Sequence, residues 1–245
     1  MFQGFYDLTS NMITQNRNMN VISNNMTNVS TPGYKSDTVV QSTFRDEMIY
    51  RFDKYGRTPV GVSSRVDTAA ARVTDHSEGA MKETGRNLDL ALAGNGFFVI
   101  QTQNGNVYTR NGSFNIDDQG YLRLDGVGRV MGTNGPIRLN TDDVVVDGQG
   151  NIRSNENGQY FGRLRLVDFA NYGQLTKITG GVFRANGQLQ NAGAAVRQKF
   201  VEDSNVSMID EMTAMMTGQR ALQSSAQVLK MYDQLIAKAV QIGSM

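Results

Sequence analysis

The stretch from Phe5 to Lys35, FYDLTSNMITQNRNMNVISNNMTNVSTPGYK, decides how the chain is organised. Its apolar residues recur at alternating intervals of four and three, which is the heptad spacing of a coiled-coil helix. This seam consists of Leu8, Met12, Gln15, Met19, Ile22, Met26 and Val29. Pro32 lacks a backbone N–H and disfavours helical geometry at Thr31, so we expect the helix to end near Ser30.

A second heptad ladder runs through the C-terminal end of the chain. Its members are Met208, Met212, Met215, Gln219, Leu222, Ala226, Leu229, Asp233, Ile236 and Val240. Ser207 and Asp210 have the spacing of a capping box that would open this helix. Each ladder contains one glutamine, Gln15 or Gln219. Such a residue either fixes the register of a coiled coil or lies at the solvent edge of the seam.

Both terminal helices are predicted to be long. Residues 3–30 and 205–241 would extend over roughly 42 Å and 55 Å, whereas a mean globular helix has about 11–12 residues. Further apolar residues such as Ile13 and Val21 widen the apolar face, and a wide face calls for more than one neighbour. We therefore expect these helices to pack with copies from other subunits. The alternative is an antiparallel hairpin of the two ends within one chain.

The composition excludes several classes of protein. The chain has 245 residues and a formal net charge of +1, which argues against binding to a nucleic-acid backbone. It has no cysteine, which excludes disulfides and thiolate metal sites. No apolar run approaches 18 residues, so we expect no membrane insertion. No cleavable secretory signal is visible, and we expect the chain to stay in the cytoplasm or leave by another route.

The middle of the chain has a different character. Short β-rich runs are separated by Asn-Gly or Asp-Gly pairs, which favour tight hairpin turns. These pairs lie at residues 104–105, 111–112, 125–126, 134–135, 147–148, 157–158 and 186–187. The pattern predicts an antiparallel, hairpin-rich all-β domain, in which no repeat of 20–50 residues is evident.

The fold class is therefore predicted to be α+β, with long N- and C-terminal helices that pair as a coiled coil around an intervening β domain. We expect a strand or short helix within residues 36–52, a loop at residues 54–65 and either structure at residues 66–79. The predicted parts are 1–35 for the first helix and its turn, 36–78 for a connector, 79–200 for the β-rich domain and 201–245 for the second helix.

Residues able to carry out catalysis are scarce. His76 is the single histidine. A catalytic triad would have to use it, and a histidine-based metal site would need more histidines. Adjacent acids such as Asp117 and Asp118 are typical of solvated turns, although a carboxylate pair could still meet in space. The sequence from Asp147 to Asn151 resembles part of a calcium loop but lacks the later glutamate. We expect no enzyme activity, no cofactor and no metal.

One segment identifies a family. The sequence NNMTNVSTPGYK at residues 24–35 resembles the signature that follows the N-terminal helix of bacterial flagellar rod and hook proteins. LDLALAGNGFF at residues 88–98, YTRNGSF at 108–114 and SNV at 204–206 also resemble segments of the rod members. Met26-Thr27 departs mildly from the Leu-Ala that is commoner in the family.

The resemblance implies a structural subunit of the basal-body rod. Such a subunit is exported by the flagellar type III apparatus without signal cleavage and self-assembles through its terminal helices into a helical axial tube that transmits torque. Its partners would be copies of itself, other rod and hook axial proteins and the export apparatus, and its location the basal body in the cell envelope. The signature residues are Asn25, Asn28, Thr31, Gly33 and Tyr34.

We expect the two asparagines to satisfy backbone groups at the helix end or to make contacts between subunits. Thr31 would form a local hydrogen bond, and Gly33 would supply a positive φ. Two other functions stay open from the residues alone. One is a secreted β-domain protein that binds or hydrolyses carbohydrate and carries helical oligomerisation arms. The other is a cytosolic coiled-coil scaffold.

Overall fold

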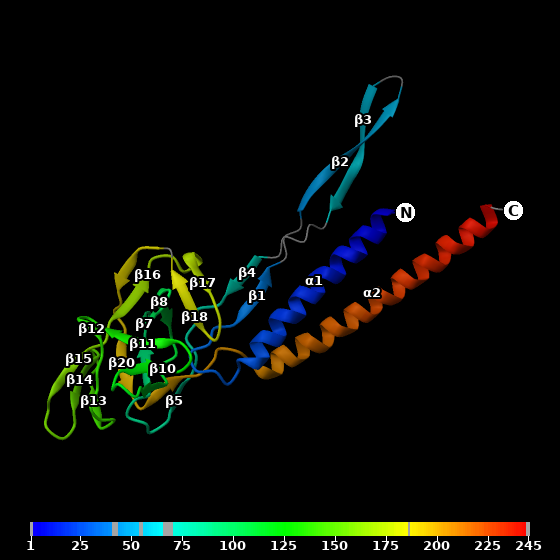
Figure 1. Ribbon diagram of the computed structural model, residues 1–245. Helices are drawn as coiled ribbons and strands as arrows, with labels where there is room; N and C mark the ends of the chain where they lie inside the picture. Colours follow the sequence, from blue (N-terminus) through cyan, green and yellow to red (C-terminus); the bar gives the residue numbers. More distant parts are fainter. Residues whose placement is uncertain (1, 41–43, 54–55, 66–70, 186, 244–245) are drawn as a thin grey trace. The chain divides into compact units, whose positions relative to one another are not determined.

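The computed structural model describes residues 2–40, 44–53, 56–65, 71–185 and 187–243. It divides into two compact units. Unit 1 comprises residues 1–26, 37–75 and 208–245, and unit 2 comprises residues 27–36 and 76–207. Helix α1 (Phe2–Thr27) and helix α2 (Met208–Gly243) belong mainly to unit 1, while unit 2 holds the large antiparallel β domain (Figure 1). The chain is therefore an α+β protein with a helix at each end.

The two helices lie side by side and run in opposite directions (Figure 1). A side chain added at Gly218 of α2 would come within 3.4 Å of Met19 of α1, and the Asn25 amide of α1 donates to Glu211 of α2 at 2.8 Å. Helix α1 ends three residues earlier than the proline rule predicts, because Asn28 to Ser30 already form turns.

Strands make up unit 2. Their bounds are β5 (Met81–Glu83), β6 (Leu90–Ala93), β7 (Phe97–Thr102), β8 (Gly105–Thr109), β9 (Phe114–Ile116), β10 (Leu122–Leu124), β11 (Gly128–Gly132), β12 (Gly135–Pro136), β13 (Val144–Val146), β14 (Asn151–Ser154), β15 (Tyr160–Arg163), β16 (Leu166–Phe169), β17 (Leu175–Lys177), β18 (Val182–Ala185), β19 (Leu189–Asn191), β20 (Ala195–Gln198) and β21 (Phe200–Glu202). A short 3₁₀ helix, η1 (Tyr172–Gln174), precedes β17.

Strand β7 lies at the centre of the main sheet. One edge pairs with β8, and the other pairs with β11 near Ile100 and with β16 near Phe98. Alternate side chains of a strand point to opposite faces of its sheet, and β7 is buried on both faces. Phe98 and Ile100 belong to the larger apolar cluster, whereas Phe97 and Val99 belong to a smaller, aromatic cluster.

Most Asn-Gly and Asp-Gly pairs connect strands that pair with each other. This holds for the pairs at 104–105, 125–126, 134–135, 147–148 and 157–158. The prediction is wrong at 111–112, because β8 and β9 each pair with other strands and Gly112 instead packs against the Leu90 carbonyl. At 186–187, Asn186 lies outside the described residues, and the flanking β18 and β19 are not partners.

The strands β9–β10–β11 and β13–β14–β15 form two antiparallel meanders of similar structure. This internal repeat was not evident in the sequence. Asp117 opens the turn of β9–β10, and Asp147 opens the turn of β13–β14 thirty residues later. In both turns the carboxylate accepts two backbone N–H groups, from the residues two and four positions on. The glycine in both turns has φ +81°. The repeat is hidden in the sequence because only the Asp-x-Gln-Gly core is shared.

The connector also differs from the prediction. Residues 56–65, predicted as a loop, form strand β3 (Gly56–Arg65), which pairs with β2 (Phe44–Asp53). Pro59 is tolerated because the register shifts beside it, between Ile49 and Tyr50 of β2, and proline is found in strands at such irregularities. Strand β1 (Asp37–Val40) pairs with β4 (Ala71–Thr74). Residues 41–43, 54–55 and 66–70 of the predicted connector lie outside the described residues.

Candidate functional site

The segment after α1, residues 27–36, forms a turn that we call the signature turn. Thr31 donates its backbone N–H to the Asn28 carbonyl at 3.1 Å and its hydroxyl to the Asn28 side chain at 3.3 Å. Gly33 has φ +66°, the left-handed conformation that the sequence predicts there. The turn is thus built from local hydrogen bonds and one glycine.

Gly33 also allows a close approach between two backbones. A Cβ at this position would overlap the carbonyl carbon of Arg110 and the nitrogen of Asn111. The Gly33 N–H donates to the Glu202 carbonyl at 2.7 Å. The signature turn therefore packs directly on the loop after β8 and on β21, and no larger residue fits.

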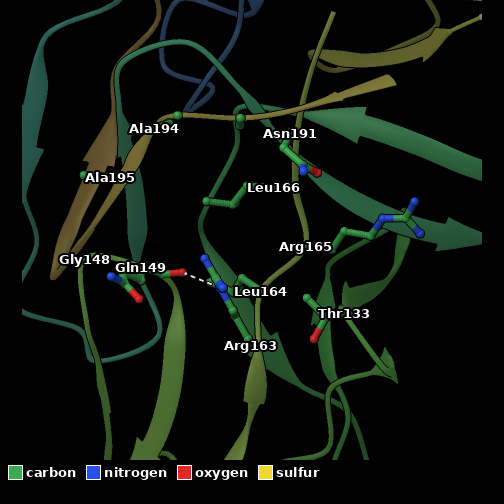
Figure 2. Close-up of a pocket in the computed structure, with 12 residues that line it drawn as sticks. Thr133, Gly148, Gln149, Arg163, Leu164, Arg165, Leu166, Asn191, Ala194 and Ala195 are labelled. Atoms are coloured by element: carbon green, nitrogen blue, oxygen red, sulfur yellow. Dashed lines mark hydrogen bonds between the residues drawn. The ribbon is translucent and has the colours of Figure 1, made fainter. Parts of the chain in front are cut away.

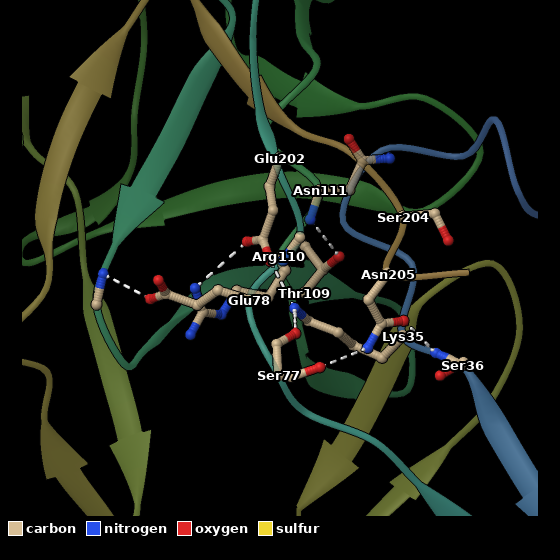
Figure 3. Close-up of polar contacts among 12 residues, drawn as sticks. Lys35, Ser36, Ser77, Glu78, Thr109, Arg110, Asn111, Glu202, Ser204 and Asn205 are labelled. Atoms are coloured by element: carbon tan, nitrogen blue, oxygen red, sulfur yellow. Dashed lines mark hydrogen bonds and ion pairs between the residues drawn. The ribbon is translucent and has the colours of Figure 1, made fainter. Parts of the chain in front are cut away.

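The Glu202 carboxylate collects donors from three other segments (Figure 3). Its Oε1 accepts from Lys35 Nζ at 2.5 Å and from the Gly79 N–H at 3.0 Å, and its Oε2 accepts from Arg110 Nη1 at 3.3 Å. The side chains of Lys35, Arg110 and Glu202 are each at most 2% exposed. We call Lys35, Gly79, Arg110 and Glu202 the Glu202 junction.

The junction is a network of buried charges in which each charge needs its partners. Lys35 Nζ also donates to the Ser77 carbonyl. Burial lowers the pKa of the Lys35 ammonium, against the opposing effect of its hydrogen bond to Glu202. Taking charges out of water costs several kcal/mol per ion, so good geometry is required to compensate.

Tyr34 is held between the turn and the main sheet. Its side chain is 1% exposed, and Lys177 Nζ of β17 lies 3.7 Å from the centre of its ring. The same ammonium donates to the Lys35 carbonyl. A cation over an aromatic face is attracted by the ring quadrupole, so Lys177 links the turn to β17 in two ways.

Asn205 joins the signature turn to the segment that leads into α2. Its Oδ1 accepts from the Ser36 N–H at 2.7 Å, its N–H donates to the Tyr34 carbonyl at 3.4 Å, and its Nδ2 donates to Ser77 Oγ at 3.2 Å. The chain therefore enters and leaves unit 2 along two segments that bond to each other.

Asn25 makes a comparable connection within unit 1. Its Oδ1 accepts from the Asp37 N–H at 3.1 Å, and its Nδ2 donates to the Asp37 carbonyl and to Glu211 Oε1, both at 2.8 Å. The side chain is 1% exposed. This single amide bonds α1 to β1 and to the first turn of α2.

The remaining seam residues are covered to different degrees. On α1, Ile22 is buried and Leu8, Met12, Gln15, Met19 and Met26 are half-buried, as is Val29 in the turn that follows. On α2, Met215, Leu222 and Leu229 are half-buried, whereas Met208, Met212, Gln219 and Ile236 are exposed. Among the described residues of α2 only Gly218 is buried, and it lies one residue before the predicted seam residue Gln219.

His76 and Tyr172 lie together in the smaller, aromatic cluster of unit 2. His76 lies with its ring centroid 4.9 Å from that of Tyr172 and 5.4 Å from that of Phe183, within the aromatic cluster. Burial and the hydrogen bond to Asp168 raise the pKa of Tyr172 to about 12. In the part of the chain that the structure describes, no group of histidine, aspartate and glutamate could hold a metal ion. In that same part, no helix is long and apolar enough to cross a membrane.

Three family models match segments of the chain. "Flagella basal body rod protein" matches residues 5–35, "Flagellar hook protein FlgE/F/G D1 domain" matches residues 91–154, and "Flagellar basal body rod FlgEFG protein C-terminal" matches residues 197–242. Each matched segment supplies one charged residue of the junction, namely Lys35, Arg110 and Glu202. Lys35 and Arg110 already lie in stretches that resemble the family, but nothing in their spacing revealed that they meet at Glu202.

Whole-chain relatives agree with these segment matches. The flagellar basal-body rod protein FlgG of Bacillus subtilis is 31% identical over 99% of both chains. The corresponding FlgG of Buchnera aphidicola subsp. Baizongia pistaciae is 31% identical over 91% of this chain and 93% of its own. The basal-body rod protein FlgF of Caulobacter vibrioides is 30% identical over 98% of both chains.

Replacing Gly33 tests the close approach. We expect Gly33→Ala to lower the free energy of unfolding by about 3 kcal/mol or more, because it adds a steric overlap to the cost of a positive φ. Gly126→Ala is the matched control, since Gly126 has φ +72° but no atom within 4 Å of its Cβ position. Urea unfolding measures both. Equal losses in the two variants would contradict the packing of Gly33 on Arg110.

Replacing members of the junction tests its charge balance. Glu202→Gln leaves two buried cations uncompensated, so we expect it to lower the free energy of unfolding by about 3–5 kcal/mol. Lys35→Met removes one cation but leaves Glu202 paired with Arg110, and we expect less than half that loss. Thermal unfolding compares these variants with the exposed Glu156→Gln as control. A larger loss for Lys35→Met than for Glu202→Gln would refute the proposed charge balance.

Proposed function

This chain belongs to the flagellar basal-body rod proteins, and on that premise we propose that it self-assembles through its terminal helices into the helical axial structure of the rod. It is a structural subunit of the rod and resides in the basal body of the bacterial flagellum. The helices would bring the subunits together through the apolar side chains that they leave exposed.

The exposed apolar surface of α2 is the observation that carries this proposal. Its large apolar side chains at least 40% exposed are Met208, Ile209, Met212, Met216, Met231, Leu235, Ile236, Val240 and Ile242. Ile209 and Ile242 exceed 70% exposure. These residues form one group at the start of α2 and another at its end. A soluble monomer rarely leaves so many large apolar side chains uncovered, so they fit a contact with neighbouring subunits.

We propose that the two helices of one chain form an antiparallel pair and that this pair joins other copies as a coiled coil. The small residues Ala214, Gly218, Ala221 and Ser225 recur along one side of α2, where they would let α1 approach closely. The exposed seam residues Met208, Met212 and Ile236 would then contact other subunits. Asn25 would keep the pair aligned through its bonds to Asp37 and Glu211.

The family relationship also supports proposals about export and torque. A chain whose helices keep an uncovered apolar face would be exported unfolded by the flagellar type III apparatus. Its terminal helices would become fully ordered only on assembly. Its partners would be copies of itself and other rod and hook axial proteins. The buried Glu202 junction would let the assembled helices pass torque to the β unit without shearing the chain between them.

The carbohydrate-active alternative requires carboxylates that converge in a concave site. A cavity of about 810 Å³ in unit 2 is lined by Arg163 and Arg165 and by no carboxylate. This arrangement gives no support to a glycosidase mechanism, which uses a pair of carboxyl groups.

Charges placed in the seam should block assembly. We expect Met215→Asp and Ile22→Asp to abolish formation of sedimentable polymer, because a carboxylate cannot be buried unpaired between helices. Gln223→Asp, at an exposed polar position of α2, is the control and should assemble normally. Hydrogen exchange of residues 90–200 would verify that the β unit stays folded. Normal assembly of both seam variants would sink the proposal.

The close approach at Gly218 offers a second test. Gly218→Ala should be tolerated, since the added Cβ would lie 3.4 Å from Met19 and alanine favours a helix. Gly218→Leu should force α1 and α2 apart and reduce polymer yield by at least about tenfold. Sedimentation of the two variants under the same conditions measures their polymer yields. Equal yields would show that the helices do not need to approach here.

A further inference from the structure

The small sheet β13–β14–β15 has opposite charges at its two ends. Its strand order and antiparallel pairing place residues 147–150 and 163–165 at one end and residues 142–143 and 155–158 at the other. The first end carries Arg163 and Arg165 with one acid, Asp147, and the second carries Asp142, Asp143 and Glu156. Because the sheet joins the two ends rigidly, this separation of charge is a fixed property of unit 2.

The basic end is hollow. Arg163, Arg165, Thr133, Gln149 and Asn191 line the cavity of about 810 Å³ together with the segment 192–195 (Figure 2). Arg163 Nε donates to the Gln149 carbonyl at 3.1 Å, and neither arginine forms an ion pair within the described part of the chain. We call this cavity the arginine pocket.

The backbone along one wall of the pocket is also available for bonding. Residues Ala192, Gly193 and Ala194 lie between β19 and β20 and form no strand, and their N–H groups make no backbone hydrogen bond among the described residues. Asp147, beside the pocket, accepts hydrogen bonds within its own turn from Gln149 and Asn151. The pocket thus offers N–H donors and two guanidinium groups to an acidic segment.

The acidic end of the sheet is exposed to solvent. Residues 155–158, Asn155-Glu156-Asn157-Gly158, form the exposed turn between β14 and β15. The Asn155 side-chain amide donates to both carboxylate oxygens of Asp143, at 3.1 and 3.2 Å. These bonds hold the turn against the segment before β13. None of Asp142, Asp143 and Glu156 forms an ion pair with a described residue. Glu156 therefore projects from a firmly held acidic tip.

We propose that the acidic tip of one copy of this chain binds in the arginine pocket of the next copy. The two surfaces are different and lie at opposite ends of one sheet, so the contact is head-to-tail. A head-to-tail contact that does not close on itself generates an open helical array. Complementary charge also fixes the register and disfavours wrong neighbours.

This inference rests on the proposed function, because it assigns to the β unit a second contact within the same assembly. It differs in the residues involved: the helices would supply apolar contact between subunits, and the arginine pocket would supply a polar contact between β units. The two can therefore be tested apart.

Disulfide trapping tests the contact directly, because the natural chain has no cysteine. Full-length Thr133→Cys, in the pocket, is mixed with full-length Gln159→Cys, beside the acidic tip, and oxidised. We expect a disulfide-linked heterodimer at a yield at least about tenfold above that of Thr133→Cys mixed with Gln103→Cys, which lies at the tip of β7–β8. Equal yields would overturn the inference.

A chain that carries both cysteines tests the head-to-tail geometry. Oxidation should give a ladder of trimers and longer species, because each copy offers one tip and one pocket. A product that stops at the dimer would mean a closed two-fold contact and would contradict the proposal.

Charge reversal tests the chemistry of recognition. Arg165→Glu in the pocket partner should lower the heterodimer yield about tenfold, and Glu156→Arg in the tip partner should restore it. Raising the salt concentration from about 0.1 M to 1 M should weaken the natural pair, since exposed charges are screened. Failure of Glu156→Arg to restore the yield would exclude Glu156 as the occupant.

These outcomes separate the two proposals. If the natural chain forms polymer but the cysteine pair gives only the control yield, the helical assembly stands and the arginine-pocket contact is wrong. If the pair cross-links while the natural chain and the seam variants all fail to form polymer, the contact stands and assembly through the helices is wrong.

Discussion

The structure depends on one buried carboxylate. Glu202 accepts hydrogen bonds from Lys35, Gly79 and Arg110, and these residues come from three segments that are distant in sequence. A buried carboxylate without partners would be strongly destabilising, so all of these segments must be in place together. The folding of unit 2 is thereby coupled to the docking of the signature turn, although that turn directly follows helix α1.

This coupling explains why the signature residues are of such different types. Gly33 provides the close approach, Tyr34 fills the space beneath Lys177, and Lys35 supplies the buried cation. Asn205, three residues beyond Glu202, bonds to the same turn before α2 begins. Both chain segments that lead to the helices are therefore bonded to the β unit.

Local patterns could be predicted from the sequence, but contacts between distant segments could not. Heptad spacing identified both helices, and Asn-Gly and Asp-Gly pairs identified five hairpin turns of unit 2, because each is set by neighbours in the chain. Strand β3 was missed since Pro59 is compatible with a strand only beside a register shift. The close approach of α1 to Gly218 of α2 was missed because the heptad pattern was read from large apolar residues, whereas the helices approach each other here at a small residue. Glu202 gave no local signal at all, since its three donors lie 92 to 167 residues away.

Amide hydrogen exchange of the natural chain, resolved by residue, tests most directly whether the signature turn is part of the β unit. The informative amides are those of Gly33, Gly79 and Asp203, which donate to Glu202 or lie beside it. We predict that they exchange at the same slow rate as the amides of β7 and β8, because all open together. Fast exchange at these amides, with β7 and β8 still protected, would show that the turn docks independently and would contradict the central role of Glu202.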